Sequence, residues 1–247
     1  MADTPSEQRL LTEFNLTDAG NAERLIARYG NDLRYVIGLG WRVWDGKRWA
    51  PDDLTVTCRA RETVRALYDE ASVLLQEANR ELDPTLRRQL ANRAEEWLRY
   101  ARRSENTRAL AALIEQARTF PAINVPASDF QLKPWCVGFQ NGVWDRGVWR
   151  THQRSDYIEH LLPVDYDSGA DRKDWQALLA RMTGGDTDLA RTLQELAGYA
   201  FSGASSLRLL PWLYGPKGTG KSTFCELLQT ALGLAGKTLR CIAAEWR

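Results

Sequence analysis

One short stretch near the C-terminal end constrains the fold more than any other part of this sequence. Gly215, Gly220, Lys221 and Ser222 match the pattern G-x-x-x-x-G-K-S/T. Glycines in such a loop let successive backbone N–H groups turn inward around a polyphosphate. The helix that begins after the loop adds the positive end of its dipole. The pattern therefore predicts a nucleotide-phosphate site, with a plain surface glycine loop as the alternative.

The residues of this loop have separate expected roles. Lys221 reaches the β- and γ-phosphates, and the Ser222 hydroxyl is placed to ligate Mg²⁺. We therefore expect ATP and Mg²⁺ as cofactors. The residues expected around the phosphates are Gly215, Pro216, Lys217, Gly218, Thr219, Gly220, Lys221, Ser222 and Thr223.

The flanks of the loop predict an α/β arrangement. Residues 209–214 are apolar and few enough for a buried parallel strand, whose paired part begins after Pro211. Beyond the loop, Phe224, Leu228 and other apolar residues recur at helical spacing, and Gly233 can end that helix. Strand, loop and helix then follow in the order of a P-loop ATPase domain.

The sequence after this helix lacks the remaining parts of such an ATPase. P-loop ATPases need an acidic residue on a second strand to hold Mg²⁺ and the attacking water. Glu245 is the only acid after Glu226, and Ala243-Ala244-Glu245 is not preceded by the four apolar residues that such a strand usually shows. We therefore expect the chain to stop inside its catalytic domain, with no complete catalytic site, and to be an enzyme only when further sequence completes it.

Composition narrows the class of protein. The 247 residues are 44% hydrophobic and 26% charged, as in ordinary globular proteins, and the formal net charge is +1. Any surface that binds nucleic acid must therefore be a local basic patch, because the chain as a whole carries almost no net positive charge. The absence of a long apolar run and of a signal-peptide pattern predicts a cytoplasmic protein.

The cysteines do not predict a zinc site. They are widely spaced, contain no C-x-x-C pair, and have only two histidines that could join them. Free thiols suit a reducing cytoplasm. These residues are Cys58, Cys136, Cys225, Cys241, His152 and His160.

The region before the loop is predicted to be α+β, with helices and two small β-hairpin units. Residues 1–16 are expected to be disordered. In residues 17–53, Thr17 or Asp18 caps a helix that runs to Tyr29, and a β-meander with a two-residue Asp45-Gly46 turn follows. Residues 54–120 are predicted to be helical, residues 121–168 to form β structure, and residues 169–205 to be helical. A domain boundary is predicted at 202–206, and residues 206–247 are predicted to form an incomplete P-loop domain.

The helical part is predicted to contain three helices, the second starting at Pro84 and the third capped by Ser104. Its centre is locally basic. Two interpretations stay open: a solvated surface interleaved with glutamates, or a ridge that faces nucleic acid. The arginines are Arg87, Arg88, Arg93, Arg99, Arg102, Arg103 and Arg108.

The two predicted β units contain similar short sequences. Val43-Trp44-Asp45-Gly46 has a counterpart in residues 143–147, and each is followed by a tryptophan. Cross-strand aromatic packing is one explanation of these tryptophans. Stacking platforms for single-stranded bases are the other.

Several segments together resemble phage and plasmid primase–helicases of helicase superfamily 3, including the poxvirus type. They are residues 17–22, 33–36, 44–46, 141–143, 162–167, 193–195, 198–199 and 221–224. The resemblance implies an AAA+-type ATPase that forms a hexameric ring around single-stranded or forked DNA. It implies that Lys221 and Ser222 bind ATP·Mg²⁺ and that the upstream region joins a primase to the motor.

The sequence departs from the family pattern at Thr219, where asparagine is usual, and at Lys217, where glycine is common. The favoured interpretation is the ATP-binding N-terminal part of a superfamily 3 DNA helicase acting in replication. The alternative is a non-enzymatic DNA-binding or interaction module with a vestigial P-loop. A small P-loop kinase is disfavoured by the long upstream region and the missing lid residues.

Overall fold

The computed structural model describes residues 14–130, 133–204 and 206–233. Most of the segment predicted to be disordered, along with Cys241 and Glu245, lies outside these residues. The chain forms two compact units. The first comprises the residues up to Asp45 together with Ala50–Asp129, and the second comprises Gly46–Trp49 and the residues from Phe130 onward.

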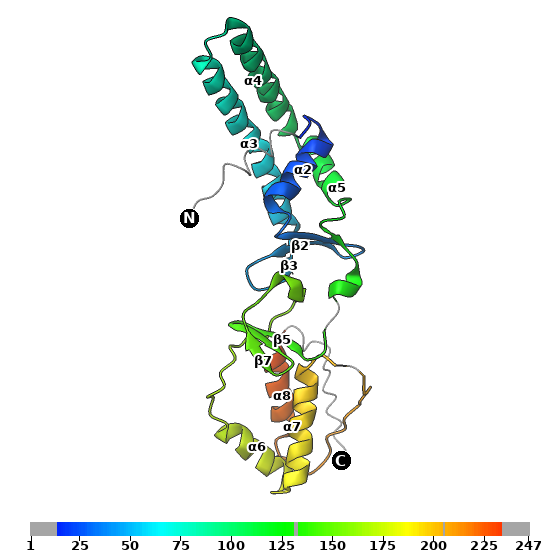
Figure 1. The fold of residues 1–247 in the computed structure, drawn as a ribbon. Helices are drawn as coiled ribbons and strands as arrows, with labels where there is room; N and C mark the ends of the chain where they lie inside the picture. The colour runs from blue at the N-terminus through cyan, green and yellow to red at the C-terminus, as the bar shows by residue number, and fades with distance from the viewer. Residues whose placement is uncertain (1–13, 131–132, 205, 234–247) are drawn as a thin grey trace. The chain divides into compact units, whose positions relative to one another are not determined.

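Helices dominate the first unit. Figure 1 shows α3 and α4 side by side as a long hairpin, with α2 and α5 near its base. The helices are α2 (Asp18–Tyr29), α3 (Asp53–Arg80), α4 (Pro84–Ser104) and α5 (Thr107–Ala117). The three helices predicted between residues 54 and 120 are therefore present.

A four-stranded sheet in the order β3-β2-β1-β4 accompanies these helices. Strand β1 pairs antiparallel with β2 and parallel with β4. The strands are β1 (Leu33–Val36), β2 (Gly40–Trp44), β3 (Trp49–Pro51) and β4 (Asn124–Val125).

Side-chain caps begin these helices. Thr17 accepts a hydrogen bond from the Gly20 N–H at 3.1 Å, which confirms the predicted start of α2. Pro84 is the first residue of α4, as predicted. The predicted Ser104 cap of α5 is wrong. Asn106 accepts from the Ala109 N–H at 2.9 Å instead, because the buried Ser104 is the last residue of α4 and its hydroxyl lies 3.4 Å from the Asn21 amide.

Arg24 is the most deeply buried charged residue among the described residues of the first unit. Arg24 is fully buried and donates to the backbone carbonyls of Phe14 and Asn15 at 2.6 and 2.9 Å. Its guanidinium also lies 5.1 Å from the Trp97 ring centre. Burial lowers the pKa of Arg24, and burial likewise raises the pKa of Glu70 despite the attraction between the two. Arg24 thus joins the residues before α2 to the helical core.

The turn after β2 is longer than the predicted two-residue hairpin. Strand β3 begins only at Trp49, so residues 45–48 form the connection. Trp49 is fully buried; its indole N–H donates to the Arg154 carbonyl at 2.9 Å, and its backbone N–H donates to the Ile158 carbonyl at 2.8 Å. The packing of Trp49 therefore decides the length of the connection.

The second unit combines a small sheet with three helices. The sheet is an antiparallel meander in the order β5-β6-β7. The elements are β5 (Cys136–Phe139), β6 (Gly142–Asp145), β7 (Val148–Arg150), α6 (Lys173–Thr183), α7 (Thr187–Phe201) and α8 (Lys221–Leu232). Arg146 and Gly147 have φ values of 48° and 92°, which suits the predicted turn between β6 and β7.

Aromatic side chains of this sheet pack against one another. Trp149 and Tyr166 have ring centres 4.7 Å apart, and Phe139 lies 5.6 Å from Tyr166. In the other β unit, Trp49 is fully buried and Trp41 is 7% exposed, whereas Trp149 is 37% exposed. The contacts favour packing over base stacking as the main role of these tryptophans.

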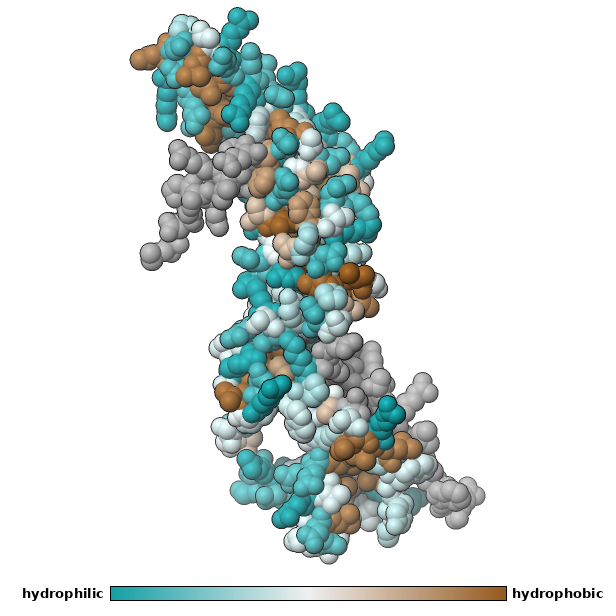
Figure 2. Space-filling view, turned by 45° about the vertical axis from the view of Figure 1, so that its right-hand side comes forward, coloured by the Kyte–Doolittle hydropathy of each residue, from teal (hydrophilic) through white to brown (hydrophobic). Residues whose placement is uncertain are grey.

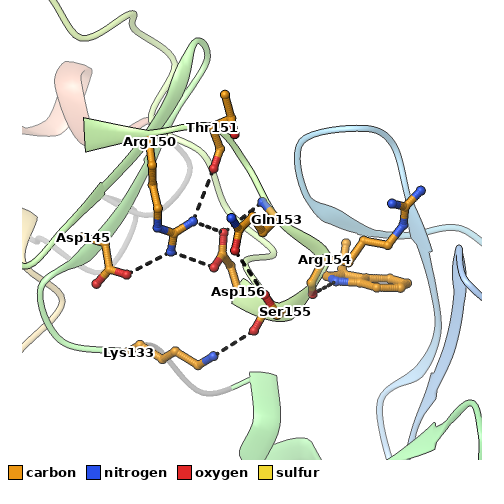
Figure 3. Close-up of polar contacts among 9 residues, drawn as sticks. Lys133, Asp145, Arg150, Thr151, Gln153, Arg154, Ser155 and Asp156 are labelled. Carbon is orange, nitrogen blue, oxygen red and sulfur yellow. Dashed lines mark hydrogen bonds and ion pairs between the residues drawn. The ribbon is translucent and has the colours of Figure 1, made fainter. Parts of the chain in front are cut away.

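An ion-pair network holds the η2 turn (Arg154–Asp156) to this sheet (Figure 3). Arg150 donates to both carboxylate oxygens of Asp156 at 2.8 and 2.7 Å, and to Asp145 at 2.9 Å. The bonds to these carboxylates raise the pKa of Arg150. Since Arg150 engages both carboxylates, this cluster is a structural clamp and not an acid–base pair.

Helices α6, α7 and α8 share one apolar cluster. Leu178, Leu193 and Ala197 pack with Phe224, which is 1% exposed, and the Trp175 and Phe224 rings stack at 5.7 Å. The compact units therefore do not divide at the predicted boundary 202–206. The physical reason is that burial stabilises the apolar face of α8, and this face is buried by packing against α6 and α7.

The strand predicted at residues 209–214 is not formed. Leu210, Trp212 and Tyr214 are 76%, 76% and 94% exposed. A strand forms only where a neighbouring strand pairs with its backbone. Within the described part of the chain, no strand pairs with these residues. Nor is any described helix both long and apolar enough to cross a membrane.

Candidate functional site: a phosphate-binding loop

The predicted phosphate loop lies directly before α8, whose first residue is Lys221. Gly218 and Gly220 have φ values of 81° and 98°, a region that L-residues with side chains rarely adopt. The glycine positions in the sequence are thus those at which the backbone makes its left-handed turns. Residues 215–218 are exposed, and residues 219–221 are half-buried.

Lys221 is folded back over its own loop. Its ammonium donates to the carbonyls of Gly215 and Pro216 at 2.9 and 2.7 Å, and to the Thr219 hydroxyl at 3.2 Å. The Thr219 hydroxyl in turn donates to the Pro216 carbonyl at 3.1 Å. These bonds hold one positive charge at the centre of the loop.

The start of α8 has backbone donors available for an anion. The first helical bond runs from the Phe224 N–H to the Gly220 carbonyl at 2.9 Å. Gly220 is the N-cap residue of α8. It has no side chain that could accept a hydrogen bond from the N–H groups of the first helical residues, Lys221 to Thr223. Ser222 and Thr223 are exposed at this end of the helix. Such an end favours phosphate through both its N–H groups and the helix dipole.

Helix α6 places a second cation at the loop. A Cβ added at Gly220 would lie 2.9 Å from Leu178 Cδ1 and 3.2 Å from Arg181 Nη2. The Arg181 guanidinium therefore lies beside the first residues of α8. Among the described residues it has no hydrogen-bond or ion-pair partner. Sequence reasoning missed Arg181 because it belongs to a different helix far upstream, where no motif marks it.

The described residues offer no obvious metal centre. They contain no group of three or more His, Cys, Asp and Glu side chains that could hold a metal ion. Cys58, Cys136 and Cys225 are free thiols, and burial raises the pKa of the Cys136 thiol. His152 contacts the Phe139 carbonyl at 2.8 Å within the second unit.

A hollow of about 620 Å³ lies between α6 and α7, away from the phosphate loop. Its lining mixes charges of both signs, among them Asp186, Arg191 and Glu195. None of the phosphate-loop residues lines it. We therefore assign it no part in phosphate binding.

Residues 22–184 match a family model described as D5 N terminal like. The match covers more than half of the chain. This chain belongs to the D5 N-terminal-like family. The family represents the N-terminal domain of phage and viral D5-like primase–helicase proteins, so the chain is a replication protein associated with a primase–helicase.

This result confirms the primase–helicase part of the resemblance. The D5 N-terminal-like match ends before the phosphate loop, so the loop is an observation separate from the family. No curated protein matches the chain.

Proposed function

We propose that this chain is the ATP-binding N-terminal part of a superfamily 3 DNA helicase with an AAA+-type ATPase domain. The observation that carries the proposal is the loop at residues 215–220, with Lys221 at its centre and the start of α8 behind it. This arrangement matches what a triphosphate needs: a cation, backbone donors and a hydroxyl for Mg²⁺.

The proposed binding step is an exchange of partners at Lys221. Phosphate oxygens replace the carbonyls of Gly215 and Pro216 as acceptors for the ammonium. The first N–H groups of α8 bind the same phosphates, and the Ser222 hydroxyl ligates Mg²⁺. The lysine needs only a short movement because it already lies over the loop.

The further partners that we propose rest on the resemblance to primase–helicases. As part of a primase–helicase, the chain would act with single-stranded or forked DNA, with a primase, and as a hexameric ring in the cytoplasm. A second candidate is a non-enzymatic module with a vestigial P-loop. Residues 209–214 favour it: most of them are exposed, and no strand in the described part of the chain pairs with them, whereas P-loop ATPases place the preceding strand inside a sheet.

Nucleotide binding tests the proposal. A fluorescent ATP analogue with Mg²⁺ should bind the wild-type chain, and Lys221→Ala should weaken binding about tenfold to hundredfold, since a hydrogen bond to a charged group contributes roughly 1.5–3 kcal/mol. Lys173→Ala is the matched control, because Lys173 is exposed on α6 and, among the described residues, forms its ion pair with Asp171. Equal affinity of wild type and Lys221→Ala would overturn the proposed site.

Hydrolysis separates the two candidates further. We expect no turnover by this chain alone, because no carboxylate hydrogen-bonds to Lys221 or Ser222 within the described residues. ATP binding without turnover would support a helicase part that needs completion. Turnover that DNA stimulates and that Lys221→Ala abolishes would instead make the chain a working motor.

A further inference from the structure

The outward side of α4 carries a cluster of arginines that neither the family nor the phosphate loop explains. We call Arg88, Arg99, Arg102 and Arg103 the arginine face. At 100° per residue, these positions fall within about 100° of the helix circumference. All four are exposed, whereas Ala94, Trp97 and Ala101 are buried on the opposite side.

Charge is distributed unequally over the α3–α4 hairpin. Helix α4 has six arginines and two glutamates, a net charge of +4. Helix α3 has four arginines against five acidic residues, a net charge of −1. Figure 2 shows hydrophilic side chains projecting along this hairpin, with hydrophobic ones at its tip. The tip includes Leu82 and Leu86, which are 87% and 42% exposed.

Glu95 and Glu96 lie between these arginines in the sequence of α4, and Glu105 follows them. Within the part of the chain that the structure describes, no residue of the arginine face forms an ion pair. Arg99 donates to the backbone carbonyl of Glu95 at 3.4 Å, and Glu105 accepts from the Tyr68 hydroxyl at 3.3 Å. On α3, by contrast, Arg59 pairs with Glu62 at 2.8 Å. The glutamates interleaved on α4 therefore form no ion pair with the arginine face in the described structure, which leaves its guanidinium groups available to another anion.

Unpaired arginines at this spacing repel one another. Arg99 and Arg103 are four residues apart and Arg99 and Arg102 three, so their charges meet on one surface of the helix. Like charges in these positions destabilise a helix. A bound polyanion would remove this penalty and use the planar, bidentate donors of arginine.

The length of the face indicates what kind of anion fits. Arg88 and Arg103 are separated by about 22 Å along the helix axis, at 1.5 Å per residue. A single phosphate cannot reach both ends, but a nucleic-acid backbone can. The face has no aromatic side chain for base stacking; its other exposed residues include Gln89, Asn92 and Glu95. Contacts of this kind bind phosphates without reading the sequence.

We propose that the arginine face of α4 binds the phosphate backbone of DNA, independently of base sequence. The proposal names the DNA-contacting surface for the proposed replication function but does not depend on nucleotide binding. All of its residues belong to the first unit, and the phosphate loop belongs to the second.

The test compares two triple variants of the full chain. Arg88→Gln with Arg99→Gln and Arg103→Gln removes three charges from the face. The matched control, Arg61→Gln with Arg65→Gln and Arg80→Gln, removes three exposed charges from α3. Glutamine has nearly the helix propensity of arginine, so both should fold, and circular dichroism checks this. The probe is fluorescent DNA of about 30 nucleotides, single-stranded or duplex, titrated at several salt concentrations.

We expect the α4 variant to lose at least about tenfold in affinity and the salt slope for single strands to fall by about 2, since each lost phosphate contact contributes roughly 0.7. The loss should be equal for different base sequences, and the α3 control should change little. Equal losses in both variants, or none in the α4 variant, would overturn the proposal. ATP binding measured on the same variants should stay unchanged, which separates this failure from failure of the phosphate site.

Discussion

Arg181 is the residue whose position at the phosphate loop has the clearest consequence. Its Nη2 lies beside Gly220, within reach of an anion bound at the start of α8. Arg181→Gln should weaken binding of the ATP analogue about tenfold, because the phosphates lose one charge-assisted hydrogen bond. Fluorescence titration with Mg²⁺ measures the change.

Arg191→Gln is the matched control for this prediction. Arg191 is an exposed arginine on α7 that lines the hollow and not the loop. Arg181→Lys should recover part of the affinity, since it restores the charge without the planar donors. An affinity for Arg181→Gln equal to that of the wild type would show that the guanidinium takes no part in binding.

At the scale of the element, α3 depends on its N-terminal cap. Asp52 accepts from the Thr55 N–H at 2.8 Å and from the Thr55 hydroxyl at 2.6 Å. Asp52→Ala should lower the free energy of unfolding by about 1 kcal/mol at neutral pH. Urea unfolding measures the difference, with Asp53→Ala as control because that residue caps nothing.

The same cap predicts a pH dependence. The bonds from Thr55 lower the pKa of Asp52 below its ordinary value of 3.8. A carboxylate whose pKa is lower in the folded state than in the unfolded state stabilises the fold fully at pH values above its unfolded-state pKa. This stabilisation is lost as the pH falls through its folded-state pKa. The difference between wild type and Asp52→Ala should therefore shrink below about pH 3.8. A constant difference throughout that range would contradict an ionised cap.

At the scale of the whole molecule, nucleotide should stabilise the second unit specifically. The loop precedes α8, which shares its apolar cluster with α6 and α7. At a nucleotide concentration one hundred times the Kd, binding adds about 2.7 kcal/mol of stability. Hydrogen exchange should slow in α6, α7 and α8 and stay unchanged in α3 and α4. Equal protection of α3 and α4 would contradict this prediction.

Many features of this chain can be predicted from its sequence because they depend on interactions between neighbouring residues. The Thr17 cap, the start of α4 at Pro84 and the end of α8 at Gly233 all follow from the residue itself or from interactions within four positions of it. The glycines of the phosphate loop belong to the same class, because their side-chain-free backbone permits the positive φ values. Even so, the closely spaced Ser104 and Asn106 show that local signals place a cap only to within a few residues.

The sequence by itself determined the helices, the turn between β6 and β7, and the composition of the phosphate loop. Tertiary structure alone decided that β4 pairs with β1, that α8 packs with α6 and α7, and that Arg181 lies beside Gly220. It also left residues 209–214 without a partner strand in the described region. The physical reason is range: caps and turns are set by neighbouring residues, whereas these contacts depend on which apolar faces meet when distant segments pack.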